Sequence, residues 1–291
     1  MNTPHTGIRY GVIRRFALLL VFAALAAGAV TLRAQQLPLP PDVTAEEGKT
    51  YQAFLTWYFG QPPEVQNESD ESIYRRYSDV LVAGASREHA ADTIKLIQRV
   101  GQRVEAERWN RILTAPKPMF NTGPNAFVVE MTKGLKPGRS LDVGMGQGRN
   151  TIFLAQQGWD SVGFDPADRA VASAQERAKA LGVKITTSVV GEEQFDWGDS
   201  QWDLIVLSYV GARDFAQKAV RALRPGGTVL VEAFHRDATK LGHIGPSVVF
   251  DTNELLRLFD GLRVVRYEDT DAVADFGLEH TRVVRLAAVK P

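Results

Sequence analysis

The stretch SLDVGMGQGRNTIFLAQQ, residues 140–157, decides the fold of this chain. It opens with a short apolar segment that contains one acid, Asp142, and is typical of a buried β-strand. A turn with three glycines follows, and the residues after it predict a helix that ends at Gly158. A strand, a glycine turn and a helix in this order form the first unit of a doubly wound α/β sheet. The three glycines are Gly144, Gly146 and Gly148.

These glycines indicate a ligand at the turn. Because glycine lacks a Cβ, the backbone can turn sharply and a ligand can approach it closely. The helix that follows directs its free N–H groups toward the same place. The spacing is G-x-G-x-G, whereas the dinucleotide-binding fingerprint G-x-G-x-x-G/A requires a small residue where Arg149 stands. The spacing therefore opposes an NAD-dependent oxidoreductase, which stays a lesser alternative.

Predicted strands and helices alternate through the rest of the chain. The segment 160–165 is a second apolar strand that ends in Asp165, and a carboxylate at this place can accept both ribose hydroxyls of a nucleoside. The last two strands lie close enough in the sequence to pair as an antiparallel hairpin. The pattern predicts an α/β protein with a Rossmann-like sheet of seven strands and a C-terminal antiparallel hairpin. The five later strands are expected at residues 184–190, 202–208, 223–233, 262–267 and 282–289.

Three strings give the chain a resemblance to the class I S-adenosylmethionine-dependent methyltransferases. They are LDVGMGQGRNTIFLAQQGWDSVGFD, QWDLIVLSY and LRPGGTVLVEAF, in the order and spacing of that family. The resemblance covers residues 109–291 and is strongest to the small-molecule branch, which includes tellurite-resistance and thiopurine methyltransferases. It implies S-adenosyl-L-methionine as the cofactor, a small molecule as the methyl acceptor and the family's seven-stranded sheet.

The resemblance also assigns cofactor-binding residues. It implies that the methionine half of the cofactor lies on the glycine turn and Asp142, the ribose on Asp165, and the adenine against Pro166. It further implies that Asn150 lies near the carboxylate of the cofactor and Glu192 near the adenine amine. Leu207 would flank the methyl donor, and Asn125 would lie over the cofactor. The family more often has Asp where Glu192 stands.

No motif identifies a general base. Methyl transfer from a sulfonium is an in-line displacement, so the protein mainly positions the reactants, and a base helps only when the acceptor must lose a proton. Tyr209 and His235 follow the fourth and fifth predicted strands, where ligands bind in parallel sheets, and are the candidate catalytic residues. The alternative for His235 is a core or loop histidine with a backbone partner. The Asp-Pro-Pro-Tyr signature of enzymes that methylate nucleic-acid amino groups is absent after residue 207, which favours a small-molecule acceptor.

Composition excludes several classes of function. The chain of 291 residues has no cysteine, so it has no disulfide, no thiolate metal site and no cysteine nucleophile, and no metal site is predicted. Basic and acidic side chains number 34 each, and the first 34 residues hold four Arg and no acid. The remainder therefore has 30 basic and 34 acidic side chains and lacks the excess of positive charge typical of nucleic-acid binding.

The N-terminal segment predicts export or a membrane tether. Arg14 and Arg15 precede an uncharged run over residues 16–32, followed by Ala34 as a small residue at a cleavage position. We therefore expect residues 1–34 to be a signal peptide or membrane anchor, and the protein to be periplasmic, secreted or tethered. The membrane would be contacted only through this leader if it is uncleaved. An exported location also keeps open a non-catalytic protein that retains the cofactor-binding fold, because S-adenosylmethionine is made in the cytoplasm.

The remaining domains follow from the periodicity. Residues 35–43 are rich in proline and predict an extended linker. Residues 44–115 have helical periodicity, with Ser86 as the N-cap of a long helix to about Leu113, and predict a helical extension. Residues 116–291 are expected to form the methyltransferase domain.

Overall fold

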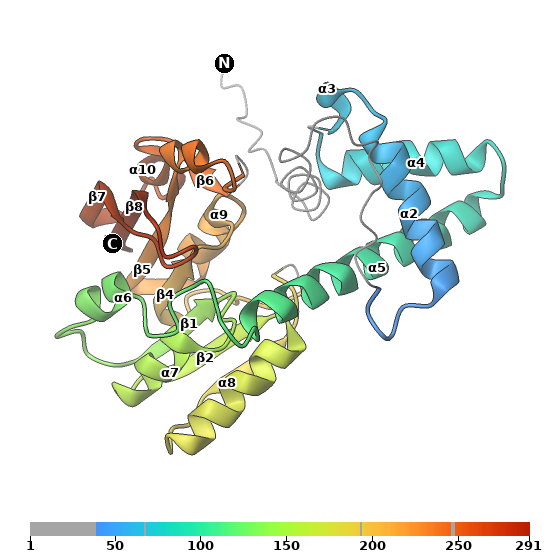
Figure 1. Cartoon of the computed structure of the whole chain (residues 1–291). Helices are drawn as coiled ribbons and strands as arrows, with labels where there is room; N and C mark the ends of the chain where they lie inside the picture. The colour runs from blue at the N-terminus through green and yellow to red at the C-terminus, as the bar shows by residue number, and fades with distance from the viewer. Residues whose placement is uncertain (1–38, 67, 193, 246–247) are drawn as a thin grey trace. The chain divides into compact units, whose positions relative to one another are not determined.

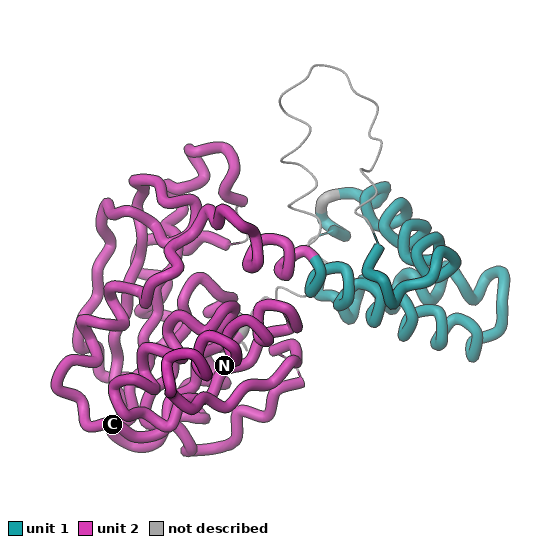
Figure 2. Tube along the Cα trace, turned by 60° about the horizontal axis from the view of Figure 1, so that its bottom comes forward, with its two compact units in different colours: residues 1–107 teal, residues 108–291 magenta. Residues whose placement is uncertain are grey.

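The computed structural model describes residues 39–66, 68–192, 194–245 and 248–291. Its chain divides into two compact units, residues 1–107 and 108–291 (Figure 2). The division falls inside the long helix α5 (Arg87–Leu113), earlier than the boundary expected after residue 115, because the last residues of this helix pack with the second unit.

The first unit is a small helical domain with an aromatic core. Helix α2 begins with a capping box, in which Thr44 accepts from the Glu47 backbone and Glu47 accepts from the Thr44 backbone. The core gathers Phe54, Tyr58 and Tyr77, with the Phe54 and Tyr77 rings 5.1 Å apart. The first three helices are α2 (Ala45–Phe59), α3 (Pro63–Gln66) and α4 (Asp70–Val82).

The second unit is built around one sheet with the strand order β3-β2-β1-β4-β5-β8-β7 (Figure 1). The five strands β3, β2, β1, β4 and β5 run parallel, and β8 pairs antiparallel with both β5 and β7. The strands are β1 (Arg139–Val143), β2 (Asp160–Asp165), β3 (Thr186–Val189), β4 (Trp202–Ser208), β5 (Leu223–His235), β7 (Arg263–Val273) and β8 (His280–Val289). This confirms the predicted fold class.

Alternate side chains of the central strands bury opposite faces of the sheet, as strand geometry requires. On β4, Leu204 and Val206 pack with α6 and α7, whereas Ile205 and Leu207 pack with α9 and α10. The helices of this unit are α6 (Ala126–Met131), α7 (Arg149–Gln156), α8 (Asp168–Ala180), α9 (Ala212–Ala222) and α10 (Glu254–Leu258), with a 3-10 turn η2 (Arg236–Leu241).

One strand was not predicted from the sequence, and one predicted segment lies outside the residues that the structure describes. A further strand, β6 (Val249–Phe250), pairs with the end of β5 and was not predicted, because two residues are too few to show a period. The leader, residues 1–34, and part of the predicted linker lie outside the described residues. Within the part of the chain that is described, none of the helices is long and apolar enough to cross a membrane.

Candidate active site

The glycine turn lies between β1 and α7, and all three of its glycines have left-handed backbone conformations. Gly144, Gly146 and Gly148 have φ angles of 64°, 53° and 72°. A Cβ on Gly144 would lie 2.6 Å from Cγ1 of Val210, so the turn is also packed too closely for a side chain. The turn therefore presents bare backbone at the carboxyl end of β1, as the sequence predicted.

Asp142 fixes the start of the helix that follows the turn. Its Oδ2 accepts hydrogen bonds from the Thr151 backbone at 3.1 Å and the Thr151 hydroxyl at 2.7 Å. Burial raises the pKa of this carboxyl to about 6, against the hydrogen bonds from Thr151 and the charge of Arg149. The carboxylate thus joins β1 to α7 and holds the turn in shape.

Asp165 at the end of β2 holds the other side of the turn. Its Oδ2 accepts from the Gly146 backbone at 2.9 Å and its Oδ1 from the Ala167 backbone at 2.8 Å. Burial raises its pKa to about 6, and Glu192 is one of the acids whose charge adds to the rise. Each oxygen of an ionised carboxylate has a second acceptor position, so both can still take a ribose hydroxyl. Pro166, which is half-buried, follows directly.

The segment before α6 is tied to the start of α7. The Asn125 side chain caps α6 by accepting from the Val128 backbone, and its own backbone N–H donates to Asn150 Oδ1 at 2.9 Å. Both asparagines are buried. Two residues predicted to contact the cofactor therefore lie together beside the glycine turn, where they position backbone as well as side chains.

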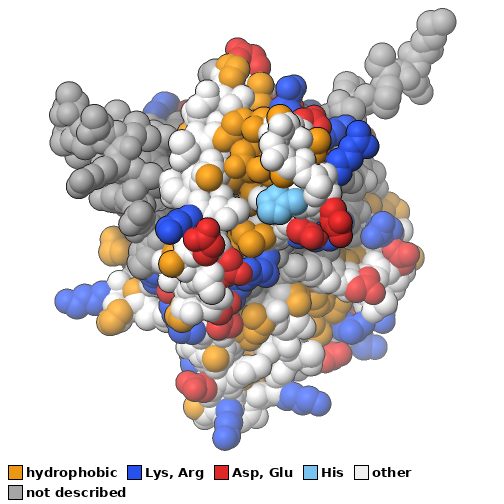
Figure 3. Space-filling view, turned by 90° about the vertical axis from the view of Figure 1, so that its right-hand side faces the viewer, with side chains coloured by type: hydrophobic (Ala, Val, Ile, Leu, Met, Phe, Trp, Pro, Cys, Tyr) orange, Lys and Arg blue, Asp and Glu red, His pale blue; other side chains and the backbone are white. Residues whose placement is uncertain are grey.

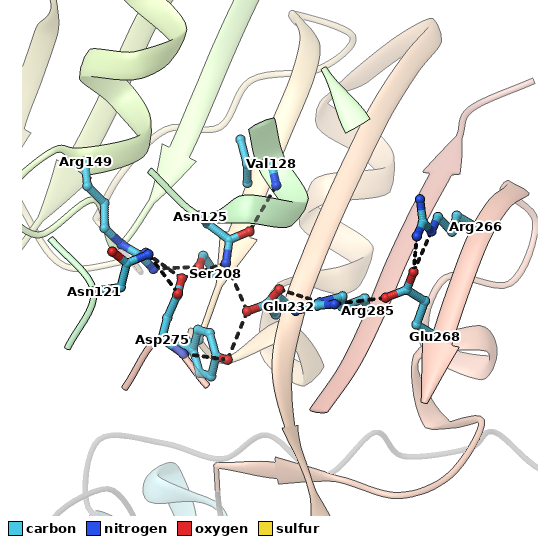
Figure 4. A network of polar contacts seen from close by, with 11 residues as sticks. Asn121, Asn125, Val128, Arg149, Ser208, Glu232, Arg266, Glu268, Asp275 and Arg285 are labelled. Carbon is cyan, nitrogen blue, oxygen red and sulfur yellow. Dashed lines mark hydrogen bonds and ion pairs between the residues drawn. The ribbon is translucent and has the colours of Figure 1, made fainter. Parts of the chain in front are cut away.

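Glu232 is the centre of a buried polar network that reaches the surface (Figure 4). Its side chain is 3% exposed. Its Oε1 accepts from Asn125 Nδ2 and from the Tyr209 hydroxyl, each at 3.0 Å, while its Oε2 accepts from Arg285 Nε at 2.7 Å. The chain of ion pairs continues from Arg285 to Glu268. The sequence signal for this network was a single acid inside the apolar strand β5.

Tyr209 lies at the predicted place but its hydroxyl is already engaged. Its backbone has a φ of 59°, a conformation that is costly for a residue with a Cβ. Its hydroxyl donates to Glu232 and accepts from the Asp275 backbone N–H at 3.2 Å. Burial first, and then the charge of Glu232, raise its pKa well above the usual range. The phenol is therefore a protonated group that fixes the end of β4, and its catalytic role stays a prediction.

His235 uses both ring nitrogens within the protein. Its Nδ1 accepts from the Asp237 backbone at 3.1 Å and caps η2, and its Nε2 lies 3.0 Å from the Thr252 hydroxyl. The ring is buried. This arrangement matches the alternative of a core histidine with a backbone partner, and a role in proton transfer stays a prediction.

An ion pair between Arg149 and Asp275 lies beside the glycine turn. The two side chains are 10% and 12% exposed. Arg149 also donates to the Ser208 hydroxyl at 3.1 Å, and Asp275 accepts from the side chains of Asn121 at 3.0 Å and Asn125 at 2.7 Å (Figure 4). Sequence reasoning missed Asp275, because 126 residues separate it from Arg149.

The end of α5 packs against the turn and against α8. A Cβ on Gly146 would lie 3.3 Å from Leu113, whose backbone oxygen accepts from the Gln147 side chain. Asn110 Oδ1 accepts from the Arg169 backbone at 2.9 Å and so caps α8, which has no side-chain cap of its own. Three further rings contact Phe276 with centroids 5.4 to 6.4 Å away: Phe120, Tyr209 and Trp109.

The side chain of Leu207, a predicted cofactor residue, lies in the hydrophobic core. It is fully buried in the core that β4 forms with α9, because it alternates with Val206 along the strand. Only its backbone, one residue before Ser208, can face a ligand. Glu192 lies after β3, on the same side of the sheet end as Asp165, whose pKa its charge raises.

The face shown in Figure 3 carries charges of both signs. On the face shown in Figure 3, Lys and Arg side chains lie among Asp and Glu side chains around a group of hydrophobic side chains. Among the described side chains drawn there, the basic ones do not form a continuous stripe of the kind that tracks a nucleic-acid backbone.

Part of the chain is similar to known methyltransferases. Residues 141–227 match the sequence profile of a methyltransferase domain. A ubiquinone biosynthesis O-methyltransferase of Rhizobium etli is 30% identical over 103 residues, which are 34% of this chain and 42% of that protein. A 2-heptyl-1-hydroxyquinolin-4(1H)-one methyltransferase of Mycobacteroides abscessus is 28% identical over 145 residues, 46% of this chain and 64% of that protein. The chain thus spans less than two thirds of each of these relatives.

A solved structure shares the fold. The N-methyltransferase NodS of Bradyrhizobium japonicum, in complex with S-adenosyl-L-homocysteine, superposes with a TM-score of 0.50 at 18% identity, over 64% of this chain and 98% of NodS. At that identity the likeness concerns the fold alone. The strand order with β8 between β5 and β7, the three left-handed glycines and the matching profile all agree. Residues 141–227 therefore match a methyltransferase domain, and the second unit has the fold of an S-adenosylmethionine-dependent methyltransferase.

Proposed function

We propose that the protein transfers a methyl group from S-adenosylmethionine to a small-molecule acceptor. The observation that carries this proposal is the pairing of Asp165 with the glycine turn, since Asp165 accepts from the Gly146 backbone across the carboxyl ends of β1 and β2. Strand order reverses between β1 and β4, and ligands bind at such reversal points in open α/β sheets.

The residues present fit this cofactor. Asp142 and Asp165 are carboxyls kept buried at a cost, with pKa values raised to about 6, and a nucleoside with two hydroxyl donors would stabilise the ionised form of Asp165. Gly144 and Gly146 have no Cβ and adopt left-handed conformations, as expected of a turn that holds a ligand against its backbone. When bound, the cofactor supplies an electrophilic methyl group on a sulfonium, and the task of this chain is to orient donor and acceptor.

The acceptor side is proposed to lie over the ends of β4 and β5. Tyr209 and His235 stand there, but their polar atoms are held by Glu232, Asp275, Asp237 and Thr252. We propose that the protein catalyses the transfer by positioning the reactants. Such a site favours acceptors whose reacting atom is already nucleophilic at neutral pH. Relatives named for hydroxyquinolone and ubiquinone chemistry support aromatic acceptors as the first class to try.

Location and branch are proposed on the sequence alone. We propose that residues 1–34 export the protein or tether it to a membrane, so that the enzyme is periplasmic, secreted or anchored. The resemblance to tellurite-resistance and thiopurine methyltransferases stays a proposal as well. Mass spectrometry of the N-terminus of the protein isolated from its cell envelope tests the first, since cleavage after Ala34 would leave a chain that begins at Gln35.

The test of the function is transfer of isotopically labelled methyl from S-adenosylmethionine. The full chain would be incubated with a panel of phenols, hydroxyquinolines, thiols and amines, with Asp165→Ala as the control variant. Labelled product that requires the wild-type protein supports the proposal. Binding of the cofactor without transfer to any acceptor would favour a non-catalytic protein that keeps the fold.

A further inference from the structure

The ion pair of Arg149 and Asp275 presents a cation and an anion side by side at the glycine turn. Burying such a pair adds little to stability, because both charges lose their hydration. Three of the hydrogen bonds to Asp275 come from Asn121, Asn125 and Arg149, so its carboxylate is oriented before any ligand arrives. An ionised carboxylate has about four acceptor positions. One position therefore stays open, and a second opens if Arg149 moves aside.

The pair also lies where one end of an elongated ligand would reach. Arg149 is the first residue of α7 and donates to Ser208, the last residue of β4. Asp165 ends β2, on the other side of β1. Neighbouring strands lie about 4.8 Å apart. A ligand whose ribose is held at β2 and which crosses β1 thus has its far end at Arg149 and Asp275.

We propose that Asp275 is a cofactor-binding residue, which accepts a hydrogen bond from the ammonium group at the amino-acid end of S-adenosylmethionine while Arg149 donates to the carboxylate. This assignment rests on the proposed function. The amino-acid end is a zwitterion, so it can insert between the two side chains and leave every charge beside an opposite one. Its insertion exchanges one ion pair for two.

The assignment makes the C-terminal hairpin part of the cofactor site. Asp275 lies in the turn between β7 and β8, and this turn is joined to the segment before α6 by backbone hydrogen bonds from Asn121 to Asp275 at 2.7 Å and from Gly277 to Met119 at 2.8 Å. The same turn carries Phe276, whose ring contacts Tyr209. The amino-acid end of the cofactor would therefore contact the same turn that carries Phe276.

The test uses calorimetric titration of the full chain with three ligands. They are S-adenosylhomocysteine, its analogue in which hydrogen replaces the amino group, and methylthioadenosine, which lacks the whole amino-acid end. The proteins are the wild type, Asp275→Asn and the control Glu279→Gln. Glu279 lies in the same turn, is exposed and pairs with His243 at 3.0 Å, whereas Asp275 pairs with Arg149.

We expect the wild type to bind S-adenosylhomocysteine about ten- to a hundred-fold more tightly than the deamino analogue, the range of one hydrogen bond to a charged group. Asp275→Asn should lose this preference and keep the wild-type affinity for methylthioadenosine, which also shows that the variant is folded. Glu279→Gln should behave as the wild type.

Equal weakening of S-adenosylhomocysteine and the deamino analogue in Asp275→Asn would overturn the assignment, since a hairpin that only supports the fold predicts that result. If the wild type binds methylthioadenosine but does not distinguish S-adenosylhomocysteine from the deamino analogue, the assignment of Asp275 is overturned while the proposed function stands. If none of the three ligands binds, the proposed function fails and the assignment with it.

Discussion

Replacing Asp165 by asparagine should change how the stability of the protein depends on pH. The carboxyl is buried, and its pKa is raised from 3.8 to about 6 in the folded protein. Because the folded protein holds this proton more tightly than the unfolded chain, the group favours folding below its unfolded pKa. Its ionisation opposes folding increasingly as the pH rises through about 6. The variant lacks this ionisation.

The magnitude follows from the shift. A rise of about two pKa units costs about 3 kcal/mol once the carboxyl is ionised in both states at pH 7. At about pH 4.5 the folded carboxyl is still protonated. The pH is less than one unit above the unfolded pKa of 3.8, so ionisation stabilises the unfolded chain by only about 1 kcal/mol. The difference between the two conditions is about 2 kcal/mol.

The assay is urea denaturation of the wild type and Asp165→Asn at both pH values, without cofactor. Asparagine also changes the hydrogen bonds from Gly146 and Ala167, but that contribution does not depend on pH and cancels in the comparison. We expect the free energy of unfolding of the variant, relative to the wild type, to be higher at pH 7 than at pH 4.5 by about 2 kcal/mol. A difference near zero, or of opposite sign, would refute the claim that burial of the Asp165 carboxylate destabilises the folded protein without its ligand.

Three further variants test the other parts of the site. Gly144→Ala should destabilise the fold by about 1–2 kcal/mol, the cost of a left-handed residue with a Cβ, and should weaken binding of S-adenosylhomocysteine further because the Cβ displaces Val210, as urea denaturation and calorimetry would show. Tyr209→Phe should cost about 1 kcal/mol of stability and leave the pH profile of methyl transfer unchanged; a lost alkaline or acid limb would instead identify the phenol as the base. Glu232→Gln should cost about 1–3 kcal/mol, because it removes the charge that accepts from Arg285, which keeps only Glu268 as an ion-pair partner; a denaturation curve like that of the wild type would show that the network is not required for the fold.

The parts of the fold that were predictable are those whose signal is local. The glycine turn, the strand that ends in Asp165 and the strand over 202–208 are each contained in fewer than ten residues, and the structure places all three as expected. The long helix α5 (Arg87–Leu113) also has a local signal, the N-cap Ser86 and its apolar stripe.

The parts that were missed depend on which strands become neighbours. Ser208 is opposite Glu232 in the β4–β5 register, and Glu232 is opposite Arg285 in the β5–β8 register, so the partner of the Tyr209 hydroxyl follows only from the assembled sheet. Asp275 reaches Arg149 because the hairpin folds back over the turn. No period or motif in the sequence contains that information; the one local signal, which the sequence analysis did not use, is that Glu232 is an acid within an apolar strand.

The most direct test of the methyltransferase assignment is calorimetric titration of the full chain with S-adenosylhomocysteine and NAD, beside Asp165→Ala. We predict that S-adenosylhomocysteine binds, that NAD does not, and that the variant loses the adenosyl compound. Binding of NAD alone, or of neither ligand, would contradict a site in which Asp165 and the glycine turn hold S-adenosylmethionine.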